Sequence, residues 1–215
     1  MSKRNTQIPL GAGMRLSPSP KPTKYFTVKR SKIAGRGAFA TKPIRKGTIV
    51  IEYTGYWVTP EEEDAHYRDD QSLDHHTFLF YVDKSKTIDA AYNGNEARFL
   101  NHACDPNCET TIRNRRVFIK AIKPIEVGQE LVYDYSFIFW GPLEKNWKIR
   151  YRCRCGSANC RGYMLDPSML KKALKAKNRT AVPESKAGNK LGKKGKGTKK
   201  KKSKANKKPE VHYVR

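Results

Sequence analysis

The cysteines of this 215-residue chain fall into two groups whose spacing suits metal binding. Cys104 and Cys108 lie near the middle of the sequence, and Cys153, Cys155 and Cys160 form a C-x-C-x4-C run much later in the chain. Zinc takes four soft ligands in a tetrahedral array, so this run and one distant cysteine could hold a single ion. The spacing does not choose between Cys104 and Cys108. A fold that brings either of them to the run fastens the C-terminal segment onto the centre of the domain.

Five blocks of sequence, one of which contains an Asn-His pair just before Cys104, stand in the order found in a known family. They are Ser31–Ala40 (SKIAGRGAFA), Ile51–Gly55 (IEYTG), Ile88–Asn95 (IDAAYNGN), Arg98–Cys108 (RFLNHACDPNC) and Gly128–Tyr135 (GQELVYDY). Each block alone is a weak signal, but five in order are very unlikely to match by chance. Over roughly residues 25 to 166, the chain resembles the SET-domain protein-lysine methyltransferases of the trithorax/Set type, which carry a cysteine-rich post-SET segment.

The resemblance implies that S-adenosylmethionine is the cofactor and supplies the methyl group. It places seven residues at the cofactor: Ala34, Arg36, Phe78, Arg98, Asn101, His102 and Tyr135. Ala34 and Arg36 are expected to act largely through backbone groups, because glycines at 35 and 37 allow a close approach. Phe78 stands where close relatives often carry a tyrosine, so a hydroxyl contact is missing there while ring packing is kept.

The resemblance also assigns the catalytic and metal-binding residues. Tyr135 is expected to orient the lysine amine, and Tyr53 and Tyr133 to line the lysine channel with it. From the residues alone, three tyrosines in a β-rich domain would more often belong to the core or the surface. The implied zinc ligands are Cys104, Cys153, Cys155 and Cys160. Cys108 is then left as a buried or semi-buried thiol.

Short apolar runs that are rich in β-branched and aromatic residues predict strands at residues 48–53, 77–82 and 116–122. Only residues 59–71 indicate a helix, with Thr59 as its N-cap and acidic residues in its first turn. The chain is therefore predicted to be mostly β. The resemblance implies the SET fold, in which several small curved sheets meet at a knot-like crossing, with a short helical insert and a zinc-stapled post-SET segment.

We expect four segments along the chain: a disordered basic arm (1–24), the SET domain (25–136), the post-SET zinc segment (137–167) and a disordered lysine-rich tail (168–215). Residues 171–209 hold 17 Lys or Arg and one acid, Glu184, which gives +16 of the chain's net +25. Such a segment cannot bury enough apolar surface to become ordered. Residues 171–208 could bind nucleic acid through counterion release, without sequence preference.

The sequence has no apolar signal region at its N-terminus and no apolar run of 18 residues, so neither a signal peptide nor a membrane span is expected. Five cysteines with metal-type spacing favour a reducing compartment. We expect an intracellular protein that associates with chromatin or a nucleoid, and that is nuclear if it is eukaryotic or acts on a host. The oligomeric state stays open, with a monomer favoured.

Residues 61–74 hold seven of the chain's 20 acids and a single base, Arg68. Such a cluster is usually a solvated helix face, but beside a substrate groove it would attract a basic peptide such as a histone tail. We therefore expect methylation of lysines in basic, histone-like proteins, mainly to the mono- and dimethyl forms. The alternatives are a nucleic-acid-binding architectural protein with an inactive SET domain, and a zinc-stabilised module that reads peptides without turnover.

Overall fold

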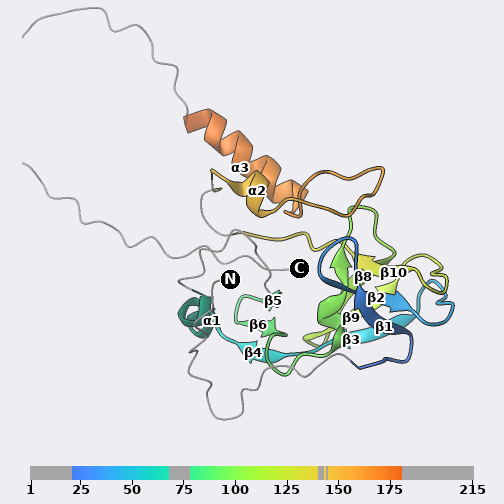
Figure 1. Ribbon diagram of the computed structural model, residues 1–215. Coiled ribbons are helices and arrows are strands. Elements are labelled where there is room, and N and C mark those ends of the chain that lie inside the picture. Colours follow the sequence, from blue (N-terminus) through green and yellow to red (C-terminus); the bar gives the residue numbers. More distant parts are fainter. Residues whose placement is uncertain (1–20, 68–77, 140–142, 144, 181–215) are drawn as a thin grey trace, which may run out of the picture.

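A computed structural model describes residues 21–67, 78–139, 143 and 145–180 (Figure 1). This part of the chain is mostly β, as predicted, and the three predicted strand segments correspond to β3, β5 and β9. The strands are β1 (Phe26–Arg30), β2 (Arg36–Ala40), β3 (Ile49–Tyr53), β4 (Tyr56–Val58), β5 (Leu79–Asp83), β6 (Lys86–Asp89), β7 (Asn101–His102), β8 (Cys108–Arg113), β9 (Arg116–Ala121) and β10 (Glu130–Tyr133). The helices are α1 (Pro60–Tyr67), α2 (Trp147–Arg150), α3 (Pro167–Thr180) and the short 3-10 helix η1 (Glu96–Phe99).

The strands form two sheets. The larger has the order β1-β2-β10-β8-β9-β3, with β7 also paired to β10, and the smaller has the order β4-β6-β5. Alternation along the strands decides which side chains enter the core. In β9, for example, Val117, Ile119 and Ala121 are buried, while Arg116 is exposed. The larger sheet has seven strands and the smaller has three, and the mostly-β content agrees with the predicted fold class.

Strand β10 is central to the larger sheet. It runs antiparallel to β2 on one side and parallel to β7 and β8 on the other. Tyr133 therefore lies opposite both His102 and Cys108, although the three residues are distant in sequence. This arrangement inserts β10 between the N-terminal hairpin and the Asn-His strand. It brings three of the five sequence blocks to one place.

The segment after β10 is fastened to the domain by its own backbone. The N–H of Phe137 donates to the carbonyl of Met164 at 2.9 Å, and the N–H of Asp166 donates to the carbonyl of Phe137 at 2.8 Å. Phe137, Tyr151 and Leu165 are almost fully buried in the main core. The C-terminal segment thus packs on the core through apolar contacts as well as through its cysteines.

Helix α1 begins as predicted, and residues 68–71 of the expected helix lie outside the described residues. The N–H of Glu62 donates to Thr59 Oγ1 at 3.3 Å, and the N–H of Thr59 donates to Glu62 Oε2 at 2.8 Å. This reciprocal pair is a capping box. Glu61 and Glu62 are exposed, whereas Glu63 is only 1% exposed. Glu63 therefore does not belong to a solvent-facing acidic surface.

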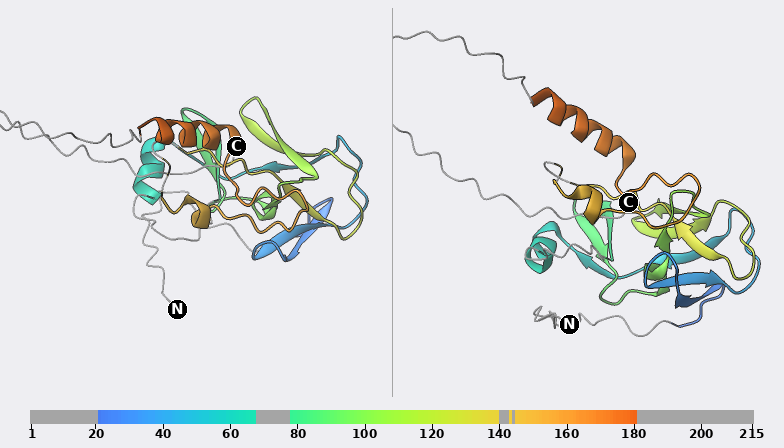
Figure 2. Two further views of the ribbon diagram at one scale, coloured as in Figure 1. Left: turned by 90° about the horizontal axis from the view of Figure 1, so that it is seen from above. Right: turned by 45° about the horizontal axis from the view of Figure 1, so that its top comes forward.

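Helix α3 corrects the expected start of the disordered tail. We placed residues 168–180 in that tail, but the structure forms a helix over Pro167–Thr180. Leu170 is buried, and Met169 and Ala173 pack against the core (Figure 2 shows the helix lying outside the sheets). The apolar positions recur at helical spacing, a pattern hidden among the lysines that dominate the composition. No helix of the described segments is long and apolar enough to cross a membrane.

Candidate functional site

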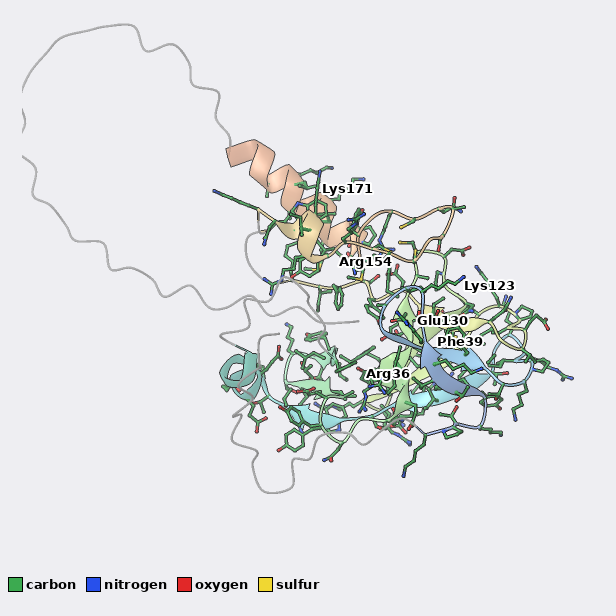
Figure 3. All side chains as sticks on the ribbon, in the orientation of Figure 1. Arg36, Phe39, Lys123, Glu130, Arg154 and Lys171 are labelled. Atoms are coloured by element: carbon green, nitrogen blue, oxygen red, sulfur yellow. The ribbon has the colours of Figure 1, made fainter. Side chains whose placement is uncertain are left out.

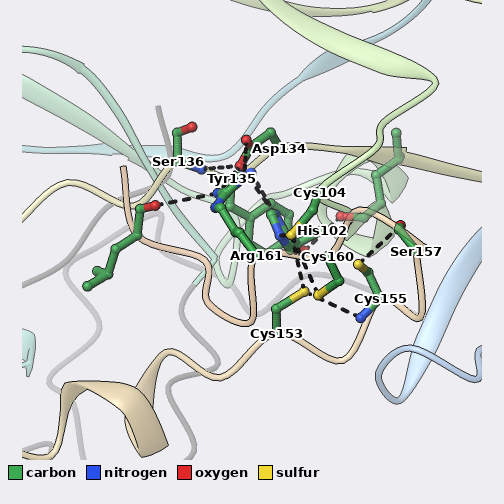
Figure 4. A network of polar contacts seen from close by, with 12 residues as sticks. His102, Cys104, Asp134, Tyr135, Ser136, Cys153, Cys155, Ser157, Cys160 and Arg161 are labelled. Atoms are coloured by element: carbon green, nitrogen blue, oxygen red, sulfur yellow. Dashed lines mark hydrogen bonds and ion pairs between the residues drawn. The ribbon is translucent and has the colours of Figure 1, made fainter. Parts of the chain in front are cut away.

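Four thiols meet beside β7. The sulfur atoms of Cys104, Cys153, Cys155 and Cys160 all lie within 4.8 Å of one another (Figure 4). Cys104 Sγ lies 3.7 Å from Cys153 Sγ and 3.9 Å from Cys160 Sγ. Sulfurs bound tetrahedrally at about 2.3 Å from zinc would be about 3.8 Å apart. The donor set and its spacing therefore fit one zinc ion.

Cys155 is the one thiol of the cluster whose pKa is lowered, whereas burial raises the pKa of Cys104 and of Cys153. Burial works against ionisation, but hydrogen bonds from the backbone N–H of Cys104 and from Ser157 lower the pKa of Cys155 to about 6. A thiol that is already ionised near neutral pH can bind a metal ion without first losing a proton.

Cys108 stands apart from the cluster. It lies in β8, is 0% exposed and belongs to the main hydrophobic core. Burial raises the pKa of its thiol to about 12, so it stays protonated. The structure therefore groups Cys104, and not Cys108, with the C-terminal cysteines.

Asn101 holds the loop that joins β1 to β2. Its Nδ2 lies within hydrogen-bond distance of the carbonyls of Ala34 and Arg36, at 3.3 and 3.0 Å, and 2.7 Å from Glu130 Oε1. Glu130 Oε2 accepts a second hydrogen bond, from the hydroxyl of Ser31 at 2.9 Å. Figure 3 shows Glu130 beside Phe39 of β2, its antiparallel partner. Two sequence blocks and the Asn-His pair thus share one hydrogen-bond network.

The two glycines of this loop are needed for different reasons. Gly35 has φ +40°, a left-handed conformation that favours glycine. At Gly37 a Cβ atom would lie 2.0 Å from Glu130 Oε1. The close approach to the cofactor that we expect at both glycines stays a prediction, and Gly37 also leaves room for the Glu130 carboxylate.

The Tyr133-Asp134-Tyr135 turn is packed against β7. The Tyr135 N–H donates to His102 Nδ1 at 3.1 Å. Burial lowers the pKa of His102 to about 4, so its ring is neutral at physiological pH and Nδ1 can accept this bond. The proton then resides on Nε2, which lies 3.4 Å from Cys104 Sγ. His102 consequently connects the backbone of the turn to the thiol cluster.

The three tyrosines expected at the lysine channel come together. The Tyr133 ring centroid lies 5.0 Å from that of Tyr135. The Tyr135 hydroxyl donates to the Leu100 carbonyl at 2.8 Å, and the Tyr53 hydroxyl donates to the Phe78 carbonyl at 2.8 Å. Burial raises the pKa of all three phenols above the ordinary value. They stay protonated at neutral pH and act as hydrogen-bonding groups, not as bases.

Phe78 and Arg98 lie next to this group. Arg98 Nη1 donates to the carbonyls of Ala90 and Gly94, both at 3.2 Å. Its guanidinium lies 5.8 Å from the centre of the Phe78 ring and 4.7 Å from that of Phe99. Arg98 and Phe78 therefore lie together, and the Phe78 carbonyl links them to the Tyr53 hydroxyl.

Comparison with known proteins agrees with this geometry. The family model described as "SET domain" matches residues 35–136. Residues 35–136 therefore form a SET domain. Histone-lysine N-methyltransferase trithorax of Drosophila virilis is 38% identical over 144 residues, which are 65% of this chain and 4% of that protein. The "Histone-lysine N-methyltransferase, H3 lysine-4 specific" of Candida albicans is 36% identical over 151 residues, 67% of this chain and 14% of that protein.

Among solved structures, an active polycomb repressive complex 2 aligns with 54% of this chain and 15% of its own chain, at 33% identity and a TM-score of 0.49. The SET-domain chain spans only a small part of the curated relatives, between 4% and 15% of the length of those compared. The matched SET region also ends at residue 136, before the three C-terminal cysteines.

Sequence reasoning missed two residues of the SET-domain site. Glu130 holds the loop between β1 and β2 through Ser31 and Asn101, as described above. Arg161 donates from both terminal nitrogens to the Asp134 carboxylate, each at 2.7 Å. Arg161 directly follows the predicted ligand Cys160, and that adjacency was the available signal.

Proposed function

We propose that this SET domain transfers methyl groups to lysine side chains of histone-like, basic proteins. The carrying observation is the β7–β10 junction, which sets Asn101 and His102 beside Tyr133 and Tyr135. The family match and the names of the curated relatives support the same activity. We further propose that residues 25–136 are the SET domain and residues 137–167 the post-SET segment, and that the protein works on chromatin as a monomer.

The proposed reaction depends more on placement than on acid-base chemistry. A lysine amine has a pKa of about 10.4 in water and must lose its proton before it can attack. Desolvation among Tyr53, Tyr133 and Tyr135 disfavours the ammonium form. The phenol oxygens keep lone pairs with which to orient the neutral amine, since their own protons go to carbonyls at Tyr53 and Tyr135. Alignment of this kind can contribute about 7–11 kcal/mol.

The chain offers groups that fit S-adenosylmethionine, which when bound supplies a methyl group on a sulfonium. Gly35 has open space where a Cβ would stand, so the loop backbone is accessible there. Ala34, Arg36, Asn101 and His102 would hold the cofactor from the loop and β7. Phe78, Arg98 and Tyr135 would contact it from the aromatic side. Cys104, Cys153, Cys155 and Cys160 would hold one zinc ion in a structural role, because all four positions are filled by protein thiolates.

Incubation of the full chain with methyl-labelled S-adenosylmethionine and core histones tests the proposed activity. We expect label in histone protein, and mass spectrometry should place it on lysine. Tyr135→Phe protein is the control for contaminating enzymes. Absence of label, together with binding to DNA, would contradict the proposal and support an architectural protein with an inactive SET domain.

We also propose that the main products are mono- and dimethyl-lysine, with Tyr133 as the residue that limits further transfer. Its ring packs against Tyr135, and its hydroxyl could anchor a water near the amine. A new methyl group would have to displace that water without replacing its hydrogen bonds, which is unfavourable. A cost of 1.4 kcal/mol already means about a tenfold bias.

Tyr133→Phe is therefore expected to shift the product towards di- and trimethyl-lysine while most of the first-transfer rate is kept. Mass spectrometry of one peptide under multiple turnover measures the distribution. The matched control is Tyr25→Phe, which makes the same change outside the site. Predominant trimethylation by the unaltered protein would show that Tyr133 does not limit the product.

The acidic start of α1 is proposed to flank the substrate groove. Glu61 and Glu62 are exposed; Asp69, Asp70 and Asp74 lie outside the described residues, and the side chain of Asp64 is not described. Glu61→Lys is expected to raise KM for a basic peptide about threefold at low salt, the size of one exposed ion pair. It should leave kcat unchanged. Glu126→Lys reverses an exposed acid elsewhere, and an equal effect there would point to overall charge instead of the groove.

The lysine-rich residues 171–208 are proposed to bind nucleic acid. Lys171, Lys172 and Lys175 are exposed on α3, and residues 181–208 lie outside the described residues. Truncation after Thr180 keeps α3 on the core and removes 12 of the 17 basic residues. Each phosphate that a basic residue neutralises adds about 0.9 to the slope of log affinity against log salt concentration. Without these residues, DNA affinity should fall more than tenfold and depend less steeply on salt. Unchanged DNA binding in titrations at several salt concentrations would contradict this.

A further inference from the structure

Arg161 occupies a position that connects the cysteine cluster with the catalytic turn. It directly follows Cys160, so its backbone is fixed wherever that cysteine is held. Its side chain is 18% exposed and points away from the thiols towards Asp134, as Figure 4 shows. Among the residues that the structure describes, no other ion pair joins the segment after residue 150 to the turn that follows β10.

The contact has two parallel hydrogen bonds. Arg161 Nη1 donates to Asp134 Oδ2 and Nη2 donates to Asp134 Oδ1, both at 2.7 Å. Nη2 also lies 3.4 Å from the Leu165 carbonyl, and the guanidinium is 5.6 Å from the centre of the Tyr163 ring. A planar guanidinium in this geometry fixes both the position and the orientation of a carboxylate, which a lysine ammonium cannot do.

Asp134 in turn shapes the backbone around Tyr135. Its Oδ1 accepts a hydrogen bond from the Ser136 N–H at 2.9 Å. Ser136 has φ +42°, a left-handed conformation that is strained for a residue with a side chain. On the other side of the turn, the Tyr135 N–H is held by His102. The carboxylate and the imidazole therefore hold the backbone on the two sides of the Tyr135 carbonyl, and with it the base from which the Tyr135 ring extends.

We propose that Arg161 is a positioning residue through which the cysteine cluster sets the orientation of Tyr135. The inference rests on the proposed function, in which Tyr135 orients the amine. The order of dependence runs from the thiol cluster to Arg161, then to the Asp134 carboxylate and the strained turn, and then to Tyr135. Arg161 does not touch the reacting atoms. Its loss should disturb the rate of transfer more than peptide binding or metal binding.

The test compares Arg161→Met, Asp134→Asn and the double variant with Arg154→Met, which removes an exposed arginine between two cysteines of the same cluster. We expect Arg161→Met to lower kcat about 10- to 100-fold, with one zinc per chain retained and KM for peptide within about threefold. The double variant should be no slower than the slower single variant, because both changes break one linkage. Arg154→Met should behave as the unaltered protein.

Hydrogen exchange supplies a readout that does not need activity. The Ser136 amide should exchange at least tenfold faster in zinc-loaded Arg161→Met than in Arg154→Met, because Arg161 no longer holds the Asp134 carboxylate to which this amide donates. Arg161→Lys should restore little protection. Unchanged exchange and unchanged kcat in Arg161→Met would overturn the inference, as would multiplicative losses in the double variant or loss of zinc from Arg161→Met. Failure of the unaltered protein to transfer methyl groups would instead contradict the proposed function.

Discussion

Replacement of Tyr135 by phenylalanine is expected to lower kcat by about 100-fold or more, which corresponds to about 2.7 kcal/mol. The Tyr135 hydroxyl donates a hydrogen bond to the Leu100 carbonyl, so the lone pairs of its oxygen point in a fixed direction. Without the hydroxyl the amine loses a guide and the buried carbonyl loses a donor. Ring contacts with Tyr133 and Phe137 remain, at centroid distances of 5.0 and 5.3 Å, so the fold should persist. Single-turnover kinetics with labelled cofactor measure the loss.

The affinity for cofactor separates a catalytic effect from a binding effect. Calorimetric titration with S-adenosylmethionine should give a Kd within about threefold of the unaltered value for Tyr135→Phe, since the ring stays in place. Tyr25→Phe makes the same chemical change on the N-terminal hairpin and should leave the rate unchanged. Retention of more than a third of the activity by Tyr135→Phe would refute the assigned role.

Cys104→Ser is expected to lower the zinc content from about one ion per chain to less than a tenth. A serine hydroxyl is a poor substitute for a thiolate, and the remaining three cysteines leave one tetrahedral position open. The segment should stay near the core through the Phe137 and Leu165 contacts, but methyl transfer should fall at least tenfold. Elemental analysis of purified protein and reaction of its free thiols measure the metal content and the exposed cysteines.

Cys108→Ser is the matched variant with a different expected result. Its zinc content should stay near one ion per chain, because Cys108 lies in the core and not in the cluster. Its stability should fall by about 1–3 kcal/mol, since a hydroxyl replaces a thiol that is 0% exposed. Chemical denaturation gives this value. Zinc loss from Cys108→Ser alone would reverse the assignment of the fourth ligand.

Local sequence patterns predicted the elements that depend on local rules. The strands that became β3, β5 and β9 carry β-branched and aromatic runs, and Thr59 was expected as the N-cap of α1, where the structure has it. Helix α3 was hidden because four lysines and an arginine fall among the few apolar positions that Met169, Leu170 and Ala173 supply. Composition then outweighed a periodicity of only one turn and a half. The burial of Glu63 likewise depends on tertiary packing that no neighbouring residue reveals.

The site residues could be predicted where they lie in a known sequence block. The hydrogen bonds between residues of different blocks could not. The resemblance supplied Asn101, His102 and Tyr135, but nothing in their spacing shows that Glu130 accepts from Ser31, which is 99 positions away. Arg161 is similar: it stands in a cysteine run whose obvious chemistry is metal binding, whereas its side chain serves a turn formed near residue 134. Long-range pairing through β10 decides both contacts, and single-chain periodicity carries no information on such pairing.

The late position of β10 in the sequence also means that β2 is synthesised well before the strand it pairs with. Glu130 pairs with Phe39, 91 positions earlier, so the nascent β1–β2 hairpin waits roughly 5–20 s for its neighbour at ordinary elongation rates. During that interval its edge has no strand to bind and could pair with another nascent chain. Residues 21–46 contain nine lysines and arginines and no acid, so two such hairpins repel each other. The positive charge of residues 21–46 thus disfavours pairing between two nascent hairpins until β10 has been synthesised.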